Sequence, residues 1–396
     1  MVQKMRKMKD SGIEWIGEIP EGWEVGQIGQ LYSERRTKVS DKNYPPLSVT
    51  MKGILPQLST AAKTDAHDDR KLVCKGDFAI NSRSDRRGSC GISEQDGSIS
   101  LINTVLQPRG EMNPGYYNWL FHTSMFADEF YKWGHGIVDD LWTTGWSDMK
   151  KIGVPIPSKC EQKQLAEHLN FECSHIDSIL SKTRSSIEEY KKLKQAVITQ
   201  AVTKGVRGER EMKDSGVEWI GEIPVEWSVA KAKYYVTITH GSDPKTEGSI
   251  PVYGSGAESF KTCGEYKEGP TVLIGRKGAT LHIPHYIEGK YWNVDTAFDV
   301  KAKNNFSLPY YYYLATSFDY KFYIAQTTLP GMTQSNYYNM FLPFPTFPEQ
   351  EEIVNYLDAK CAEIDGLIAK KEQLVRELES YKKSLIYEVV TGKREV

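Results

Sequence analysis

Basic residues in two glycine-containing turns are the side chains best suited to chemistry in this sequence. Arg83, Arg86 and Arg87 lie in the segment NSRSDRRGS, and Arg276 and Lys277 lie in the turn GRKG. The planar guanidinium group suits bidentate contact with guanine or phosphate. A turn flanked by glycine also lets the backbone approach a phosphate closely. These turns indicate contact with nucleic acid, although a solvated surface loop explains any single arginine equally well.

Two further loops carry side chains that could read base edges. The segments GIVDDLWTTGWS and TTLPGMTQSN each precede a Pro-x-Pro sequence at a comparable place in the chain. Threonine, glutamine and tryptophan in such loops can contact bases, and packing loops explain the same composition. The candidate residues of these loops are Trp142, Thr143, Thr328, Thr333 and Gln334.

Signatures of catalysis are missing from the sequence. It contains no GxxxxGK[ST] phosphate loop, no HExxH and no GxSxG. The segment 43–46, Asn-Tyr-Pro-Pro, is superficially similar to the Asn-Pro-Pro-Tyr of adenine methyltransferases, but its order differs and no glycine-rich cofactor turn accompanies it. His282 and His285 lack a third ligand at metal spacing, and a charged loop explains Asp68 and Asp69 better than a nuclease site. We therefore expect no catalytic residue and no bound metal.

Length and composition set the class of protein. The 396 residues are 39% hydrophobic and 26% charged, which is typical of a soluble chain with two or more cores. A net charge of −2 restricts any DNA contact to local basic patches. No apolar run is long enough to span a membrane and no signal peptide opens the chain, so we expect a cytoplasmic protein. The six cysteines are far apart in sequence and are expected to be buried thiols.

The chain is an internal duplication. Residues 8–23, MKDSGIEWIGEIPEGW, are nearly repeated 204 residues later at 212–227, MKDSGVEWIGEIPVEW. A second match, EQKQLAEHLN from Glu161 with EQEEIVNYLD from Glu349, has an offset of 188 residues. The segment between the matched flanks is therefore longer in the first copy. The flanks of the two copies are alike, and their middles differ.

Both copies show the same expected order of elements. Each opens with W-I-G-E-I-P-x-x-W, which Gly and Pro keep extended and which two tryptophans anchor as a clip. Strands, a helix, a glycine-containing loop and Pro-x-Pro follow. The first copy predicts strands over 71–80 and 98–108 and a helix over 114–133, and the second predicts strands over 270–275 and 291–302 and a helix over 308–325. The dissimilar middles are expected to share a fold.

A long amphipathic helix follows each Pro-x-Pro. Apolar residues recur there at spacings of three and four, which makes a narrow seam that needs a partner helix. A twofold relation between the copies would pair the two helices antiparallel with one module at each end, and some 40 helical residues would reach roughly 60 Å. Homodimerisation through the helices is the alternative. The seam residues are Leu165, Leu169, Ile176, Leu180, Ile187, Tyr190 and Val197 in the first copy and Ile353, Leu357, Ile364, Leu367, Leu374, Leu378, Tyr381 and Leu385 in the second.

The predicted architecture is therefore α/β (α+β). Two globular domains related by a pseudo-twofold axis are separated by two long antiparallel coiled-coil helices. The expected boundaries are 8–157 for the first module with its clip, 158–205 for the first helix, 212–345 for the second module with its clip, and 346–393 for the second helix.

These motifs together resemble the specificity subunits of Type I restriction-modification systems. The resemblance rests on MKDSGxEWIGEIPxxW at the start of each copy, GRKG at 275–278, TTLPGMTQSNYYNM at 327–340, PFPTFPEQEEIVNYLD at 343–358 and VTGK at 390–393. It spans nearly the whole chain, and the combination is specific although each piece alone is weak. The first module has NSRSDRRG and DLWTTGWSDM in place of GRKG and TTLPGMTQ, so the two modules are expected to read different sequences.

The resemblance implies a DNA-recognition protein without catalysis of its own. Each target-recognition domain would read one half of a bipartite, asymmetric site in double-stranded DNA, and the paired helices would set the spacer between the halves. The helices and flanking repeats would dock two adenine-N6 methyltransferase (M) subunits, which use S-adenosylmethionine. Nuclease/translocase (R) subunits that depend on ATP and Mg would join for cleavage. No cofactor is expected on this chain itself.

Two rival readings come from other classes of protein. One is a coiled-coil adaptor that binds proteins, which would lack salt-sensitive, sequence-selective DNA binding. The other is a self-sufficient DNA enzyme with an unrecognised site, which would methylate or cut DNA without added subunits.

Overall fold

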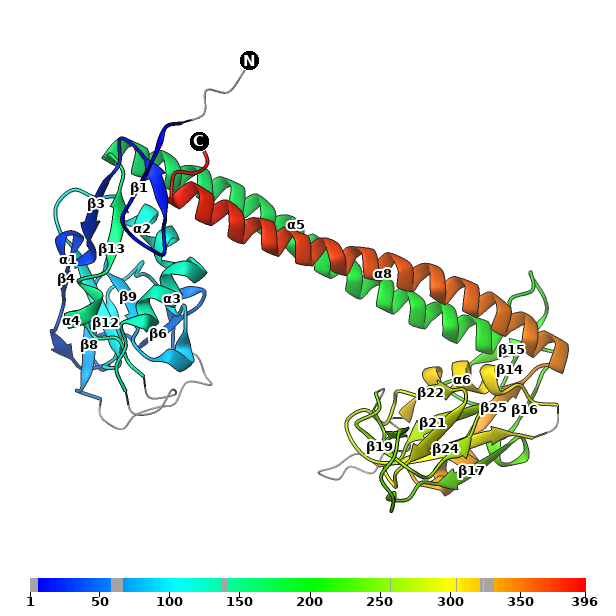
Figure 1. Ribbon diagram of the computed structural model, residues 1–396. Helices are drawn as coiled ribbons and strands as arrows, with labels where there is room; N and C mark the ends of the chain where they lie inside the picture. The colour runs from blue at the N-terminus through cyan, green and yellow to red at the C-terminus, as the bar shows by residue number, and fades with distance from the viewer. Residues whose placement is uncertain are drawn as a thin grey trace. The chain divides into compact units, whose positions relative to one another are not determined.

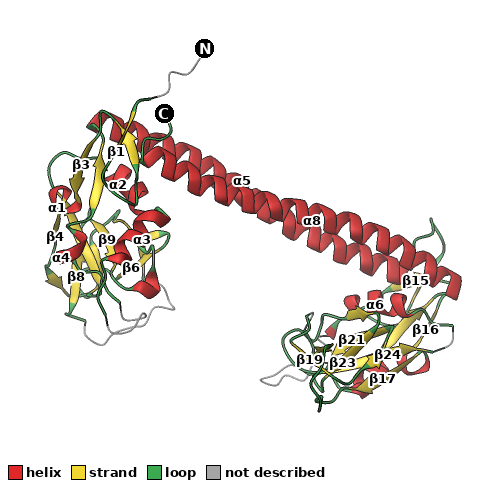
Figure 2. Cartoon of the chain, viewed as in Figure 1, coloured by secondary structure: helices red, strands yellow, loops and turns green. Residues whose placement is uncertain are grey.

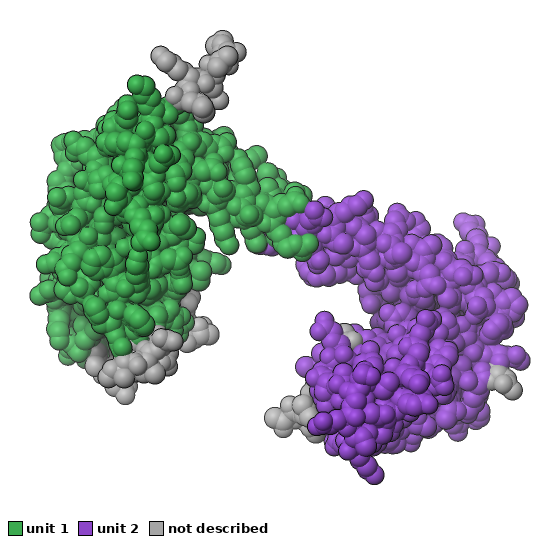
Figure 3. All heavy atoms as spheres, viewed as in Figure 1, with its two compact units in different colours: residues 1–182, 374–396 green, residues 183–373 purple. Residues whose placement is uncertain are grey.

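The structure is a computed structural model that describes residues 6–57, 67–136, 142–256, 258–303, 305–320, 323 and 331–396. The chain forms two compact units (Figure 3). Unit 1 comprises residues 1–182 and 374–396, and unit 2 comprises residues 183–373. Among the described helices, none has the length and apolar character that a membrane span requires.

Two long helices are shared between the units. Helix α5 (Lys159–Lys204) and helix α8 (Phe347–Val390) agree in extent with the helical segments expected from the sequence. The sequence boundaries give each helix a domain of its own, whereas the compact units divide α5 after Lys182 and α8 after Gln373. The division arises because each module packs against the start of one long helix and the end of the other.

The two helices pair antiparallel, as expected from the duplication (Figure 1). In unit 2, Lys194 Nζ lies 2.6 Å from Asp365 Oδ2, and nearby Lys371 Nζ lies 5.7 Å from the ring centre of Tyr190. In unit 1, Lys382 Nζ lies 2.6 Å from Asp177 Oδ1. Asp177 and Lys382 hold the positions equivalent to Asp365 and Lys194 in the repeat. The same ion pair therefore forms twice, with the two helices exchanging roles.

The predicted seam faces inward. Of its fifteen residues, nine are buried and four are half-buried, while Leu374 and Tyr381 are exposed, contrary to expectation. Toward the ends of the helices the seam joins the cores of the modules, with Leu165 and Leu169 in the unit 1 core and Ile353 and Leu357 in the unit 2 core. One apolar stripe thus serves both the helix pair and the globular modules.

The repeated clip is a short antiparallel hairpin in both units. Strand β1 (Met8–Asp10) pairs with β2 (Glu18–Pro20), and β14 (Met212–Asp214) pairs with β15 (Glu222–Pro224) in the same register. The second tryptophan of each clip, Trp23 or Trp227, is 1% exposed. Burial of these large side chains anchors the hairpins.

Each module is closed by a two-stranded ribbon that joins its beginning to its end. The first strand after the clip pairs with the strand that contains the first proline of Pro-x-Pro. These ribbons are β3 (Glu24–Gln27) with β13 (Gly153–Ile156) in unit 1, and β16 (Ser228–Lys231) with β25 (Phe341–Phe344) in unit 2.

The dissimilar middles share a central antiparallel sheet (Figure 1, Figure 2). The strand order is β4-β12-β9-β10 in unit 1 and β17-β24-β21-β22 in unit 2. The expectation of a shared fold is therefore confirmed. The strands are β4 (Tyr32–Glu34), β12 (Asn103–Pro108), β9 (Phe78–Asn81) and β10 (Cys90–Ile92), and β17 (Val236–His240), β24 (Ala297–Ala302), β21 (Thr271–Gly275) and β22 (His285–Ile287).

The remaining strands differ between the modules. Unit 1 has an antiparallel sheet β11-β8-β5 and a hairpin β6-β7, whereas unit 2 has a sheet β19-β18-β23-β20 in which β18 and β23 run parallel. The bounds are β5 (Lys38–Val39), β6 (Leu47–Thr50), β7 (Gly53–Pro56), β8 (Arg70–Val73) and β11 (Gly97–Ser100), and β18 (Ile250–Tyr253), β19 (Lys261–Cys263), β20 (Lys267–Glu268) and β23 (Lys290–Asn293).

The helix expected over 114–133 is two helices, α2 (Pro114–Phe121) and α3 (Ser124–Lys132). Thr123 separates them, because its hydroxyl donates to Leu120 O and accepts from Phe126 N as the N-cap of α3. The helix expected over 308–325 is α6 (Leu308–Ser317), which ends where Phe318 turns extended. The short helices are α1 (Ile28–Leu31), α4 (Trp146–Met149), α7 (Gln334–Asn339), η1 (Ser84–Arg86) and η3 (Ala232–Tyr234).

Each module is completed by the last turn of the helix that follows the other module. Tyr116 Oη donates to Val390 O at 2.6 Å, and Tyr310 Oη donates to Val202 O at 3.1 Å. Carbonyl groups in the last turn of a helix have no partner within the helix. Burial raises the pKa of both tyrosines well above the ordinary value.

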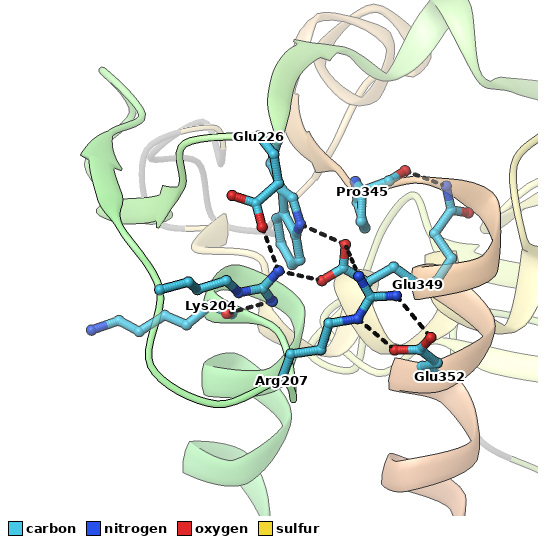
Figure 4. A network of polar contacts seen from close by, with 9 residues as sticks. Lys204, Arg207, Glu226, Pro345, Glu349 and Glu352 are labelled. Atoms are coloured by element: carbon cyan, nitrogen blue, oxygen red, sulfur yellow. Dashed lines mark hydrogen bonds and ion pairs between the residues drawn. The ribbon is translucent and has the colours of Figure 1, made fainter.

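A buried carboxylate fixes the same junction in unit 2 (Figure 4). The side chain of Glu349, in the first turn of α8, is 2% exposed and pairs with Arg210 Nη1 at 2.7 Å. It also accepts from Trp227 Nε1 at 3.0 Å. Arg210 Nη2 donates to Lys204 O, at the end of α5, at 3.2 Å. One carboxylate thus connects a helix start, a clip and a helix end.

Unit 1 repeats the core of this network with the equivalent residues. Arg6 pairs with Glu161 and lies 5.5 Å from the ring centre of Trp23, as Arg210 lies 5.5 Å from that of Trp227. Both junctions therefore combine an ion pair with a cation–π contact.

Replacing Tyr310 by Phe is expected to lower the free energy of unfolding of the chain by about 1–3 kcal/mol, because buried carbonyls lose their donor while the packing is kept. Tyr116→Phe is expected to have a similar cost through unit 1. Urea denaturation followed by circular dichroism measures both. The control is Tyr234→Phe at a side chain that is 62% exposed. Equal stability of Tyr310→Phe and the control would contradict the role of the hydroxyl.

Candidate nucleic-acid interface

Both basic turns leave the same strand of the shared sheet. Arg83 follows β9 and starts η1, and Arg276 follows β21, whose five residues are all buried. These two strands hold the same place in the strand order of their modules. The turn after β21 requires glycine at Gly278, where φ is +110°. The sequence therefore presents a basic turn at one corresponding corner of each module.

The loop before Pro-x-Pro closes on this turn in both modules. Arg83 forms an isolated antiparallel bridge with Thr143, and Lys277 forms one with Gly331. Thr143 and Gly331 are equivalent positions of the repeat. In unit 2 the contact is reinforced by Met332 N donating to Arg276 O at 2.8 Å. The two groups of candidates that the sequence suggested separately are thus brought together twice.

The side chains of the turns divide into exposed and supporting ones. Arg83 and Lys277 are exposed. Arg276 is half-buried, and its Nη1 donates to Asp295 O at 3.0 Å and to Asp295 Oδ2 at 3.2 Å, which holds the turn. Arg83 and Lys277 are therefore the cations best placed to meet a phosphate.

The two remaining arginines of the first turn are exposed beside acidic groups. Arg86 Nε lies 3.5 Å from Asp85 Oδ2. Arg87 pairs with Asp128, and its guanidinium lies 6.0 Å from the ring centre of Tyr131. A nearby carboxylate offsets part of each positive charge. We expect them to contribute less to DNA binding than Arg83.

Several loop candidates hold the loops in shape. Thr333 Oγ1 accepts from Asn336 N at 3.0 Å as the N-cap of α7, and Gln334 Nε2 donates to Ile238 O at 2.7 Å. Trp142 packs on Gly134, where an added Cβ would lie 2.0 Å from the indole Cδ1. Thr143 is exposed, and Thr328 lies outside the described residues.

Sequence reasoning missed one neighbour of the second turn. Ser255, in a Gly-Ser-Gly loop, has its Oγ 3.3 Å from Thr280 Oγ1, and an added Cβ at Gly278 would lie 3.2 Å from Ser255 Oγ. Hydroxyl groups beside a basic turn are suited to phosphate oxygens. The run of small residues was the only available signal. Within the described ranges, no group of three His, Cys, Asp or Glu side chains could hold a metal ion.

Comparisons with known proteins point to one family. Residues 229–376 match the Type I restriction modification DNA specificity domain. The chain is 22% identical over 420 residues to a putative Type I restriction enzyme MjaX specificity subunit of Methanocaldococcus jannaschii, covering 96% of this chain and 95% of that protein. It is 27% identical over 236 residues to the MjaVIII specificity subunit of the same organism, covering 56% and 51%.

Two solved structures share the fold. A chain from a study of complex assembly and conformational transition of the type I R-M system has a TM-score of 0.76 at 12% identity, covering 94% of this chain and 98% of that one. The HsdS subunit from Thermoanaerobacter tengcongensis has a TM-score of 0.54 at 15% identity, covering 95% and 98%. At these identities the likeness establishes the fold alone.

Replacing Lys277 by Ala is expected to weaken binding of duplex DNA and to lower the slope of log affinity against log salt by about one, the change expected when one phosphate contact is lost. Fluorescence anisotropy over a series of salt concentrations measures both quantities. Recognition by the first module should be unchanged. Lys370→Ala, at an exposed position of α8, controls for net charge. Equal affinity and slope in the two variants would remove Lys277 from the interface.

Proposed function

We propose that this chain, which belongs to the specificity subunits of Type I restriction-modification systems, reads a bipartite, asymmetric site in double-stranded DNA and leaves catalysis to other subunits. The observation that carries the proposal is the exposed basic turn bridged by the loop before Pro-x-Pro, built at equivalent places in both modules. Phosphate contacts position such a module on the duplex, and neighbouring side chains specify bases.

Each module is proposed to read one half of the site. Shared central sheets support a common way of placing the basic turn, and the unlike outer strands support different base preferences. The residues proposed for the two DNA-reading surfaces are Arg83, Arg86, Arg87, Trp142 and Thr143 in the first module and Arg276, Lys277, Thr328, Thr333 and Gln334 in the second. Among them, Arg83 and Lys277 are assigned to phosphates. Arg276, Thr333 and Gln334 act by holding the turn and loops in place.

The repeated flanks are proposed to dock two adenine-N6 methyltransferase subunits. The twin contacts of Tyr116 and Tyr310 with the opposite helices, and the twin ion pairs of Glu161 and Glu349, support equivalent handles in the two units. S-adenosylmethionine would be bound by these partners. Nuclease/translocase subunits that use ATP and Mg would join the assembly for cleavage.

The paired helices are proposed to set the spacer between the two half-sites. Inserting four residues after Lys182 and four after Lys370, its equivalent, is expected to lengthen the recognised spacer. Four helical residues add about 6 Å, which is between one and two base pairs at about 3.4 Å each. Matched insertions keep both ion pairs in register, whereas an insertion in α5 alone would shift one against the other. Mapping methylated adenines in the host genome reads the spacer, and an unchanged spacer would contradict this role.

Purified chain without other subunits is expected to bind duplex DNA in a salt-sensitive way and to transfer no methyl groups. Adding the methyltransferase subunit and S-adenosylmethionine should produce methylation at a bipartite site. Methylation by the chain alone would favour a self-sufficient enzyme. Absence of selective DNA binding by the chain and by the mixture would favour a protein-binding adaptor.

A further inference from the structure

A groove of about 870 Å³ lies in unit 2 between the last turns of α5 and the turn of the second clip. Ala196, Thr199 and Thr203 line one wall, and Trp219, Ile220 and Gly221 line the other. Trp219 is half-buried, while the equivalent Trp15 in unit 1 is 7% exposed. A partly exposed tryptophan beside an open groove is typical of a surface that another chain covers.

The corresponding place in unit 1 is filled by the chain itself. Tyr387, on α8, holds the position equivalent to Thr199. Its hydroxyl donates to Ile16 O at 3.1 Å, and Ile16 is the equivalent of Ile220. Lys393 Nζ donates to the same carbonyl at 3.0 Å and to Tyr387 Oη at 2.7 Å. A tyrosine and a lysine therefore close the space between helix end and clip in unit 1.

In unit 2 the residues equivalent to Tyr387 and Lys393 do not repeat these contacts. Thr199 is too short to cross it, and its Oγ1 lies 3.3 Å from Ser317 Oγ. Gly205 stands where unit 1 has Lys393, and an added Cβ there would lie 1.9 Å from Arg210 Nη2. The network of Arg210 and Glu349 thus excludes a side chain at residue 205, whose φ is +76°.

We propose that this groove receives a tyrosine side chain from a methyltransferase subunit, placed as Tyr387 is placed in unit 1. Its hydroxyl would donate to Ile220 O, and its ring would cover Trp219. This inference rests on the proposed docking of methyltransferase subunits. It makes the two docking sites unequal, because unit 2 offers a groove beside Trp219 whose equivalent in unit 1 is occupied by Tyr387. The subunit at unit 2 is bound more tightly.

The test fills the groove with a larger side chain of this protein. Thr199→Tyr supplies the unit 1 residue at the equivalent position, and Thr199→Ser is the conservative control. The methyltransferase subunit that co-purifies with this chain is isolated and titrated onto each variant. Native mass spectrometry measures the affinities of the first and second binding steps. Wild type and Thr199→Ser should show two unequal sites. Thr199→Tyr should weaken the tighter site at least about tenfold and leave the other unchanged, since aromatic anchors dominate many interfaces.

A second pair of variants keeps the test decisive if Thr199→Tyr lowers the melting temperature. Ala196→Trp blocks the same groove from an exposed helix position, and Ser384→Trp places the same side chain at the equivalent exposed position of unit 1. Only Ala196→Trp should weaken the tighter site. The groove proposal would be overturned if two subunits bind and neither Thr199→Tyr nor Ala196→Trp changes their affinities. It would also be overturned if Ala196→Trp and Ser384→Trp weaken binding equally. No bound subunit on wild-type chain would instead overturn the proposed docking function itself.

Discussion

The carbonyl groups at the end of a long helix need donors, and this requirement organises the structure. Tyr116 and Tyr310 each supply one such donor from a buried position in a module, to the helix that follows the other module. Because each module helps to complete the helix that follows the other module, the flanks of the two copies must match each other. The segments between the flanks carry no such obligation, which is why sequence and outer strands can differ between the modules while the central sheet is kept.

Much of this fold could be predicted from the sequence. The repeat and its two offsets showed that the flanks of the two copies match and that their middle segments differ. The spacing of apolar residues by three and four positions predicted both long helices and the seam between them. The break at Thr123 was not foreseen, because the apolar spacing of 114–133 continues across a residue whose hydroxyl caps the next helix. Nor could the sharing of each helix between two compact units be foreseen, since periodicity shows which face is apolar and not which module covers it.

The candidate interface was also predictable only in part from the sequence. Residue type and glycine spacing located the basic turns, and position before Pro-x-Pro located the loops. The bridges from Arg83 to Thr143 and from Lys277 to Gly331 are contacts between distant segments, which need the assembled sheet to become visible. Arg276, Thr333 and Gln334 look as suitable for DNA as their neighbours in sequence. Only their hydrogen bonds show that they support the backbone of the site.

Because each module is completed by the helix that follows the other module, the two units are completed in a fixed order during translation. Unit 2 is one continuous stretch, residues 183–373, so its core is complete as soon as that stretch has left the ribosome. Unit 1 begins earlier but needs Leu385, Val389 and Val390 of α8, which are made after the whole of unit 2. The module made first is therefore the one finished last, and the part of its core that α8 covers stays open to water while the other half is synthesised.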